Sequence, residues 1–110
     1  MLVSFLSGIG SNSAWFVDSG ASRHMTRTQE LFANLSKEDL DLHVELGTNA
    51  KCVVEGVGTV RFQLESRGSL EVASVLYVSE LKINLLSVSA MEDKGYTITF
   101  EDGQVLIRPK

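Results

Sequence analysis

Apolar residues recur with a period of two over most of the chain, which predicts strands. Between residues 42 and 78 apolar positions alternate with polar ones, and polar segments at 47–50 and 66–69 interrupt the run. Such alternation marks a half-buried strand, and a short glycine-containing break between two such runs marks a turn. Residues 42–78 are therefore predicted to form two β-hairpins.

Shorter apolar segments flank these hairpins. Residues 14–17 are a continuous apolar run that ends at Asp18-Ser19-Gly20, which is typical of a short buried strand. Residues 96–100 alternate, and a turn at 101–104 separates them from a last strand at 105–107. The segment 36–40 fits a turn or a helix start that Ser36 caps.

The best helix prediction covers residues 86–95. Ser87 or Ser89 is a suitable N-cap, and Gly95 stands where a helix commonly ends in a left-handed residue. The fold class is therefore mostly β with one short helix in the C-terminal half. Small polar residues at 7–14 predict a flexible lead-in, so that 1–13 precede a single domain at 14–110.

Composition narrows the possible functions. The chain has 110 residues, with 10 Lys and Arg against 14 Asp and Glu, and its net charge is −4. The basic residues are scattered, which argues against a nucleic-acid surface. No apolar run approaches the roughly 20 residues that span a membrane. A single cysteine, Cys52, and two histidines are too few for a usual four-ligand zinc site of nitrogen and sulfur ligands.

Candidate chemistry lies at Asp18-Ser19-Gly20. An Asp at the end of an apolar strand can serve as an acid or a base if a partner separates the pKa values of the two groups. The chain contains no second Asp-Ser/Thr-Gly triplet, so a twin carboxylate would have to come from another chain. Taken alone, the triplet is more often an ordinary turn.

Longer segments around this triplet resemble a known family. Residues 15–25, Trp-Phe-Val-Asp-Ser-Gly-Ala-Ser-Arg-His-Met, look like the active-site segment of Ty1/copia-type LTR retrotransposon proteases, which are retropepsin-like aspartic proteases. Residues 44–49 and 54–60 resemble that family's flap hairpin and the strand after it. Residues 76–78 and 83–88 are similar to its late hydrophobic signature, and the three segments come in the family's order.

This resemblance implies a closed β-barrel, one half of the active enzyme per chain, and a homodimer with one Asp18 from each chain. The two carboxylates would share a proton and activate a water molecule, as in the aspartic-protease class, without a metal or cofactor. Ser19 would orient the carboxylates, and Gly20 would accept hydrogen bonds from the bound peptide. The implied substrate-binding residues are Ala21, Ser22, Leu46, Gly47, Thr48 and Asn49.

The function expected on this basis is a homodimeric aspartic endopeptidase that cleaves a Gag–Pol polyprotein in cytoplasmic virus-like particles. The apolar end segments 3–6 and 105–107 are expected to contribute to the dimer interface. The alternative is a catalytically silent module that uses the same fold for dimerisation or peptide binding. A third possibility is an unrelated sandwich domain with an accidental match.

Single residues around the triplet have competing interpretations. His24 is near enough in sequence to modulate the carboxylates, but a packed or hydrogen-bonded side chain is favoured. Arg23 is interpreted as a solvated charge rather than as a partner of an acid across the dimer. Cys52 is predicted to be a buried, inert thiol, and His43 to be exposed. Residues 92–94 are predicted to be a solvated helix face.

Overall fold

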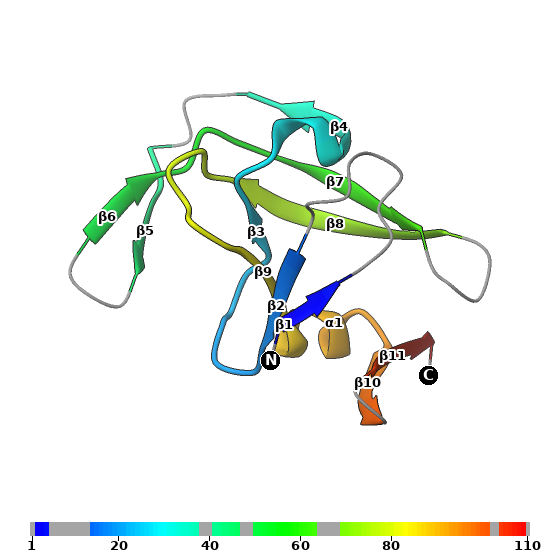
Figure 1. Cartoon of the computed structure of the whole chain (residues 1–110). Coiled ribbons are helices and arrows are strands. Elements are labelled where there is room, and N and C mark those ends of the chain that lie inside the picture. Colours follow the sequence, from blue (N-terminus) through cyan, green and yellow to red (C-terminus); the bar gives the residue numbers. More distant parts are fainter. Residues whose placement is uncertain are drawn as a thin grey trace.

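One seven-stranded sheet organises the chain, and two smaller sheets and a short helix flank it (Figure 1). The structure is a computed structural model that describes residues 2–4, 14–37, 41–46, 50–63, 69–101 and 104–109. The strand order in the large sheet is β1-β2-β9-β3-β8-β7-β4. In chain order these strands are β1 (Leu2–Ser4), β2 (Ala14–Asp18), β3 (Met25–Thr26), β4 (Phe32–Ser36), β7 (Gly56–Gln63), β8 (Ser69–Tyr77) and β9 (Asn84–Ser87).

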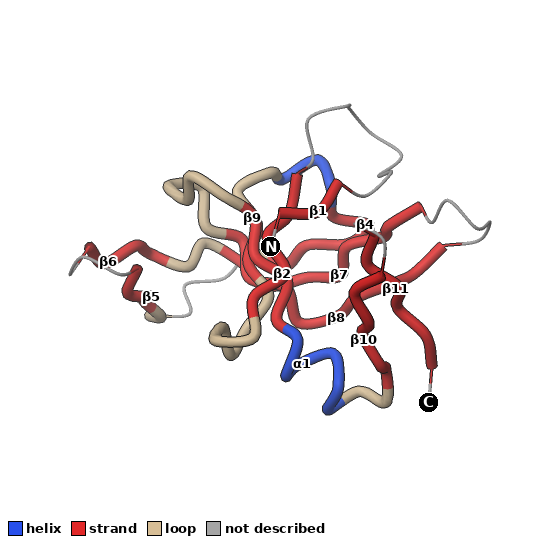
Figure 2. The backbone as a smooth tube through the Cα atoms, turned by 60° about the horizontal axis from the view of Figure 1, so that its bottom comes forward, coloured by secondary structure: helices blue, strands red, loops and turns tan. Residues whose placement is uncertain are grey.

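The smaller sheets are two hairpins at opposite ends of the molecule (Figure 2). One joins β5 (His43–Leu46) to β6 (Ala50–Val53), and the other joins β10 (Tyr96–Glu101) to β11 (Gln104–Pro109). The helix α1 (Val88–Asp93) follows β9, and a 3-10 turn, η1 (Gln29–Leu31), precedes β4. Among the described helices, none has the length and apolar character needed to cross a membrane.

The central feature of the large sheet is the insertion of β9 between β2 and β3. β9 runs parallel to β2, with Asp18 beside Ser87, and antiparallel to β3, with Met25 beside Leu85. β3 in turn runs parallel to β8. Parallel neighbours require long connections, so this arrangement brings residues 14–26 and 84–87 together although most of the chain separates them.

The sheet separates two hydrophobic cores, and its strands supply side chains to both. Trp15 and Val17 point into the first core, whereas Phe16 packs against the second. In β9, Leu86 belongs to the first core and Leu85 to the second. Burial on both faces explains why the strand at 14–17 is continuously apolar rather than alternating.

The centre of the first core is an edge-to-face pair of Trp15 and Phe62, with ring centroids 5.0 Å apart. The second core is formed around residues from the hairpin β5–β6 and from the turn after β8. Its buried members are Met25, Cys52, Val54, Leu76, Val78, Leu81 and Leu85.

A β-bulge interrupts the long pair β7–β8. The register shifts between Gly58 and Val60, and Ser74 on the opposite strand has a φ of 61°. Buried positions in β8 therefore move from Val72 to Val75, three residues apart instead of two. A bulge adds a residue to one strand and increases the local twist, so the two ends of β8 face differently.

The predicted fold class is confirmed in its coarse form, since the chain is mostly β with one short helix. The two hairpins expected within 42–78 are present, and Ser87 caps α1 as expected. Ser36 ends β4, where it pairs with Val57 of β7. The turn or helix start predicted at 36–40 cannot be compared further, because residues 38–40 lie outside the described residues. The lead-in at 5–13 lies outside the described residues.

Closure of the barrel is not seen in the described part of the sheet. β1 and β4 stand at the two ends of the strand order, and a closed barrel would need a pairing between them. The terminal strands pair within the chain, β1 with β2 and β11 with β10. A role for these ends between two copies of the chain stays a prediction.

The close approach of β4 to β7 predicts that a larger residue at Gly58 destabilises the protein. A Cβ atom at Gly58 would overlap the carbonyl oxygen of Asn34 and would lie 2.9 Å from the Cα of Leu35. Gly58→Ala is therefore expected to lower the free energy of unfolding by about 2–3 kcal/mol, since backbone atoms cannot yield as a flexible side chain does. Urea denaturation would measure the loss. Thr59→Ala, one residue along β7, is the control, and equal losses in both variants would contradict this packing.

Candidate functional site

The Asp18-Ser19-Gly20 triplet forms a turn at the carboxyl end of β2. The Asp18 side chain is half-buried, and its Oδ1 accepts a hydrogen bond of 2.7 Å from the backbone N–H of Gly20. Ser19 and Gly20 are exposed. A carboxylate that bonds to the backbone two residues later is a common way to close a turn, and Asn does it equally well.

Ser87 lies beside this turn and connects three segments. Its side chain is fully buried, and its Oγ donates to the carbonyl oxygen of Ala21 at 2.6 Å and accepts from the N–H of Ala90 at 3.1 Å. Its backbone N–H donates to Nδ1 of His24 at 2.9 Å. Through these bonds, one serine fixes the loop after β2, the histidine before β3 and the first turn of α1.

Asn84, at the other end of β9, also bonds to a segment that is distant in the sequence. Its Oδ1 accepts from the hydroxyl of Thr26 at 2.7 Å and from the N–H of Arg27 at 3.0 Å. The Thr26 hydroxyl also accepts from the N–H of Thr28 at 3.1 Å. Because buried polar groups are costly when unpaired, these bonds select one position for the segment 21–28 against β9.

His24 is buried, with 3% of its surface exposed. Burial, together with the nearby positive charge of Arg23, lowers the pKa of its imidazole from 6.5 to about 4, and burial is the larger of the two causes. The ring is therefore neutral at pH 7, and because Nδ1 accepts from Ser87, the proton lies on Nε2. The prediction of a packed, hydrogen-bonded histidine is confirmed.

The other predicted site residues are spread over two regions. Ala21 is half-buried and its carbonyl accepts from Ser87, whereas Ser22 is exposed. Leu46 ends β5, and residues 47–49 of the predicted lid lie outside the described residues. Cys52 is buried and His43 is exposed, as predicted.

Comparison with known proteins places this fold in a family. A family model described as "Pol polyprotein, beta-barrel domain" matches residues 15–96, and the chain therefore belongs to that family. The chain is also 30% identical over 91 residues to the "Retrovirus-related Pol polyprotein from transposon TNT 1-94" of Nicotiana tabacum. The match covers 83% of this chain but only 7% of that polyprotein. No solved structure matches the chain.

These findings correct the expectation of a Ty1/copia-type aspartic protease. The relation to a retrotransposon Pol polyprotein is confirmed, but the matching family is its beta-barrel domain and not its protease. The aspartic endopeptidase function is therefore wrong, and the catalytic roles of Asp18, Ser19 and Gly20 lose the family on which they rested. The physical reason is that an Asp-Ser-Gly triplet after an apolar strand serves equally well as a turn closed by its Asp side chain.

Sequence analysis did not identify the buried bonds of Asn84 and Thr26. It also did not identify the bonds of Ser87 to the segment before β3. The signal was present in part, because Asn84 and Ser87 bracket two leucines in a strand that is buried at all four positions. Polar residues in such a strand must have buried partners. The partners themselves lie about 60 residues earlier in the chain, where no local pattern identifies them.

Ser87→Ala is expected to destabilise the protein by about 2–3 kcal/mol. The substitution removes the cap of α1 and leaves the carbonyl of Ala21 without its shortest hydrogen bond. Ser89→Ala is the matched control, since Ser89 is exposed and its own bond to Ala21 is 3.3 Å long. Thermal unfolding of both variants would measure the difference. A loss at Ser89 as large as that at Ser87 would contradict the assignment.

The buried His24 also predicts how stability depends on pH. Between pH 6.5 and about 4 the unfolded chain binds a proton at this residue that the folded chain does not bind. The free energy of unfolding should therefore fall by up to about 1.4 kcal/mol per pH unit as the pH drops through this window, and this loss is absent above pH 6.5. Denaturant titrations across this range would show the slope. His24→Asn should reduce it and His43→Asn should retain it, whereas an unchanged slope in His24→Asn would refute the prediction.

Proposed function

We propose that this chain is a polypeptide-binding module of a Pol polyprotein, which takes an extended segment as an added strand on its β5–β6 hairpin. The observation that carries this proposal is that β5 and β6 form a separate two-stranded sheet, with no further strand on either edge among the described residues. Strand edges of this kind are templates for pairing with another polypeptide.

The hydrogen-bond pattern of the hairpin supports this use. The N–H of Val54 donates to the carbonyl of Leu42 at 3.0 Å. Bonded pairs alternate along an antiparallel ladder, so Val44 and Cys52 bond to each other across the hairpin. The next pair, Glu45 and Lys51, then directs its backbone N–H and C=O groups outward, to the two open edges.

The hairpin is also anchored to the rest of the fold before any partner binds. The side chains of Val44 and Cys52 pack on the second core, so the hairpin is anchored by one face. Exposed apolar side chains lie on or next to the hairpin segment and just before β9, with 41% of Leu42, 49% of Val53 and 42% of Ile83 accessible. A pre-organised edge lowers the entropic cost of binding, and these side chains give a partner apolar surface to cover.

The proposed occupant is another segment of the same polyprotein. In the tobacco relative the matching region is a small part of a long Pol polyprotein, and a tethered segment binds at a high effective concentration. Homodimer formation through the same edge is the competing outcome.

The test uses proline, which removes an outward N–H without removing a bond within the hairpin. Glu45→Pro and Lys51→Pro each block one edge, and Glu45→Ala and Lys51→Ala control for the side chains. Overlapping peptides of about ten residues from the Pol polyprotein that carries this domain would be tested for binding by fluorescence anisotropy. A peptide pairs with only one of the two edges, so only the proline variant that blocks that edge is expected to weaken binding. The expected loss is about tenfold or more relative to the alanine control at the same position.

Two results would contradict the proposal. Binding that is equal in the proline and alanine variants would mean that the hairpin edges are not the site. If no peptide binds, while sedimentation shows a dimer that Glu45→Pro or Lys51→Pro dissociates, the edge pairs with a second copy of the chain instead.

A further inference from the structure

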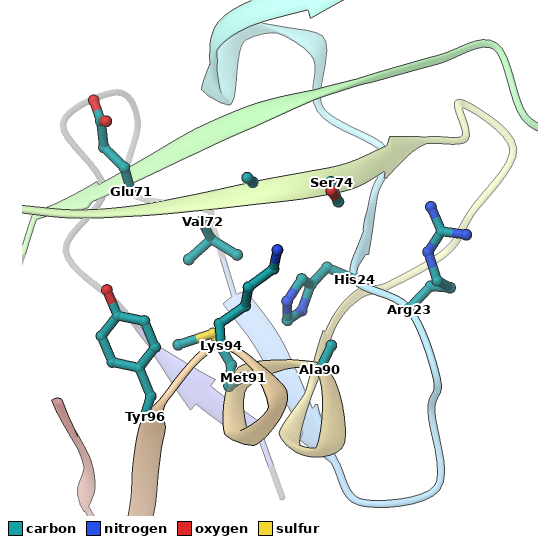
Figure 3. A pocket seen from close by; sticks show the side chains of 10 residues that line it. Arg23, His24, Glu71, Val72, Ser74, Ala90, Met91, Lys94 and Tyr96 are labelled. Carbon is teal, nitrogen blue, oxygen red and sulfur yellow. The ribbon is translucent and has the colours of Figure 1, made fainter. Parts of the chain in front are cut away.

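A pocket on the other side of β9 is distinct from the hairpin and has a volume of about 270 Å³ (Figure 3). It lies between the loop before β3, the bulged part of β8, and α1 with the residues that follow it. No residue of β5 or β6 lines it. The volume is slightly below the range of about 300–1,000 Å³ that is usual for drug-sized ligands, so it suits a small group.

His24 supplies a hydrogen-bond donor to this pocket. Its ring points into the pocket in Figure 3, and its Nδ1 is already occupied by the N–H of Ser87. The remaining Nε2–H donates to no acceptor within the part of the chain that the structure describes. Only 3% of the His24 surface is exposed, but Nε2 is not a buried unpaired atom, so a ligand or water in the pocket can accept from it.

The charged residues of the pocket favour an anion. Arg23 and Lys94 both line it, and neither has a carboxylate partner among the described residues. The one carboxylate in the lining, Glu71, is already paired with Arg61 at 2.6 Å. Two cations and one neutral imidazole donor therefore line a pocket whose one described carboxylate, Glu71, already has a cationic partner.

Ser74 and Tyr96 add hydroxyl groups to the lining, and part of the remaining surface is apolar. This apolar part favours a carboxylate with an aliphatic body over an inorganic anion. Val72, Ala90 and the buried Met91 line the wall beside His24 and Lys94 (Figure 3). A phosphate or sulfate ion would leave this wall uncovered. A carboxylate on a short aliphatic body would bond to the imidazole and the ammonium group and would also cover Val72 and Met91.

We infer that this pocket binds an aliphatic carboxylate, with His24 Nε2–H and Lys94 as its direct partners and Arg23 as a nearby positive charge. The carboxylate can be a free small acid or the C-terminal carboxylate of a polypeptide that ends in an apolar residue. This inference does not depend on the hairpin edges, and either proposal can fail without the other.

The experiment is an NMR titration of the whole labelled chain at pH 7 with 4-methylpentanoate, and in parallel with the neutral 4-methylpentanamide. Saturable shifts are expected at the His24 ring and around Lys94 with the acid, with no shift at the exposed His43. The amide should bind at least about fivefold more weakly. Equal binding of acid and amide, or shifts that do not saturate, would overturn the inference.

Lys94→Met is the main variant, because it keeps an apolar side chain of similar length at an exposed position and removes the charge. It should weaken acid binding roughly fivefold, whereas Lys82→Met, an exposed lysine outside the pocket, should leave binding unchanged. Equal affinity in both variants would overturn the assignment of Lys94. Acetyl-Gly-Gly-Leu with a free carboxylate, compared with its carboxamide, then separates the sources. Tighter binding of this peptide than of 4-methylpentanoate assigns a polypeptide terminus, and the reverse assigns a small acid.

Discussion

The fold depends on buried hydrogen bonds at the two ends of one short strand, β9. Asn84 begins this strand and Ser87 ends it, and both side chains are buried with partners in the segment 21–28. Between them, Leu85 and Leu86 face opposite cores. Burial of the leucines favours β9 in the middle of the sheet, but apolar packing alone has little directional preference. The polar partners give it one register, because a shift of one residue would leave them unpaired in the interior.

The two proposed binding sites, the edges of the β5–β6 hairpin and the pocket beside His24, are both positioned by contacts to β9. On the side of Leu85, the second core anchors the hairpin β5–β6 by one face and leaves its edges open. On the other side, Ser87 orients His24 and caps α1, and these two elements form part of the pocket wall. The molecule thus has two separate surfaces with different chemistry. One is suited to main-chain pairing with an extended polypeptide, and the other to a small anionic group with an apolar body.

The parts of the fold that the sequence predicted are those with local causes. Alternation over 42–78 predicts two hairpins, and Ser87 and Gly95 frame the helix, because periodicity and capping act within a few residues. The insertion of β9 between β2 and β3 has no local signature, since Ser87 bonds to His24 across 63 positions. At the Asp18 triplet a local pattern is present, but it does not identify one role. This local pattern is compatible with both a catalytic carboxylate and a closed turn, and the family match to residues 15–96 removes the protease family on which the catalytic interpretation rested. The close approach of β4 that requires a glycine at position 58 has no local signature either, because the neighbouring atoms belong to Asn34 and Leu35.

The most direct test of this account is the protonation of the His24 ring at pH 7, measured by two-bond nitrogen–proton correlation in labelled protein. If Ser87 holds the loop as described, Nδ1 is an unprotonated acceptor and the proton is on Nε2. A neutral ring with its proton on Nε2 is the predicted result. A proton on Nδ1, or a doubly protonated ring at this pH, would contradict the account, because neither form can accept the hydrogen bond from the Ser87 backbone.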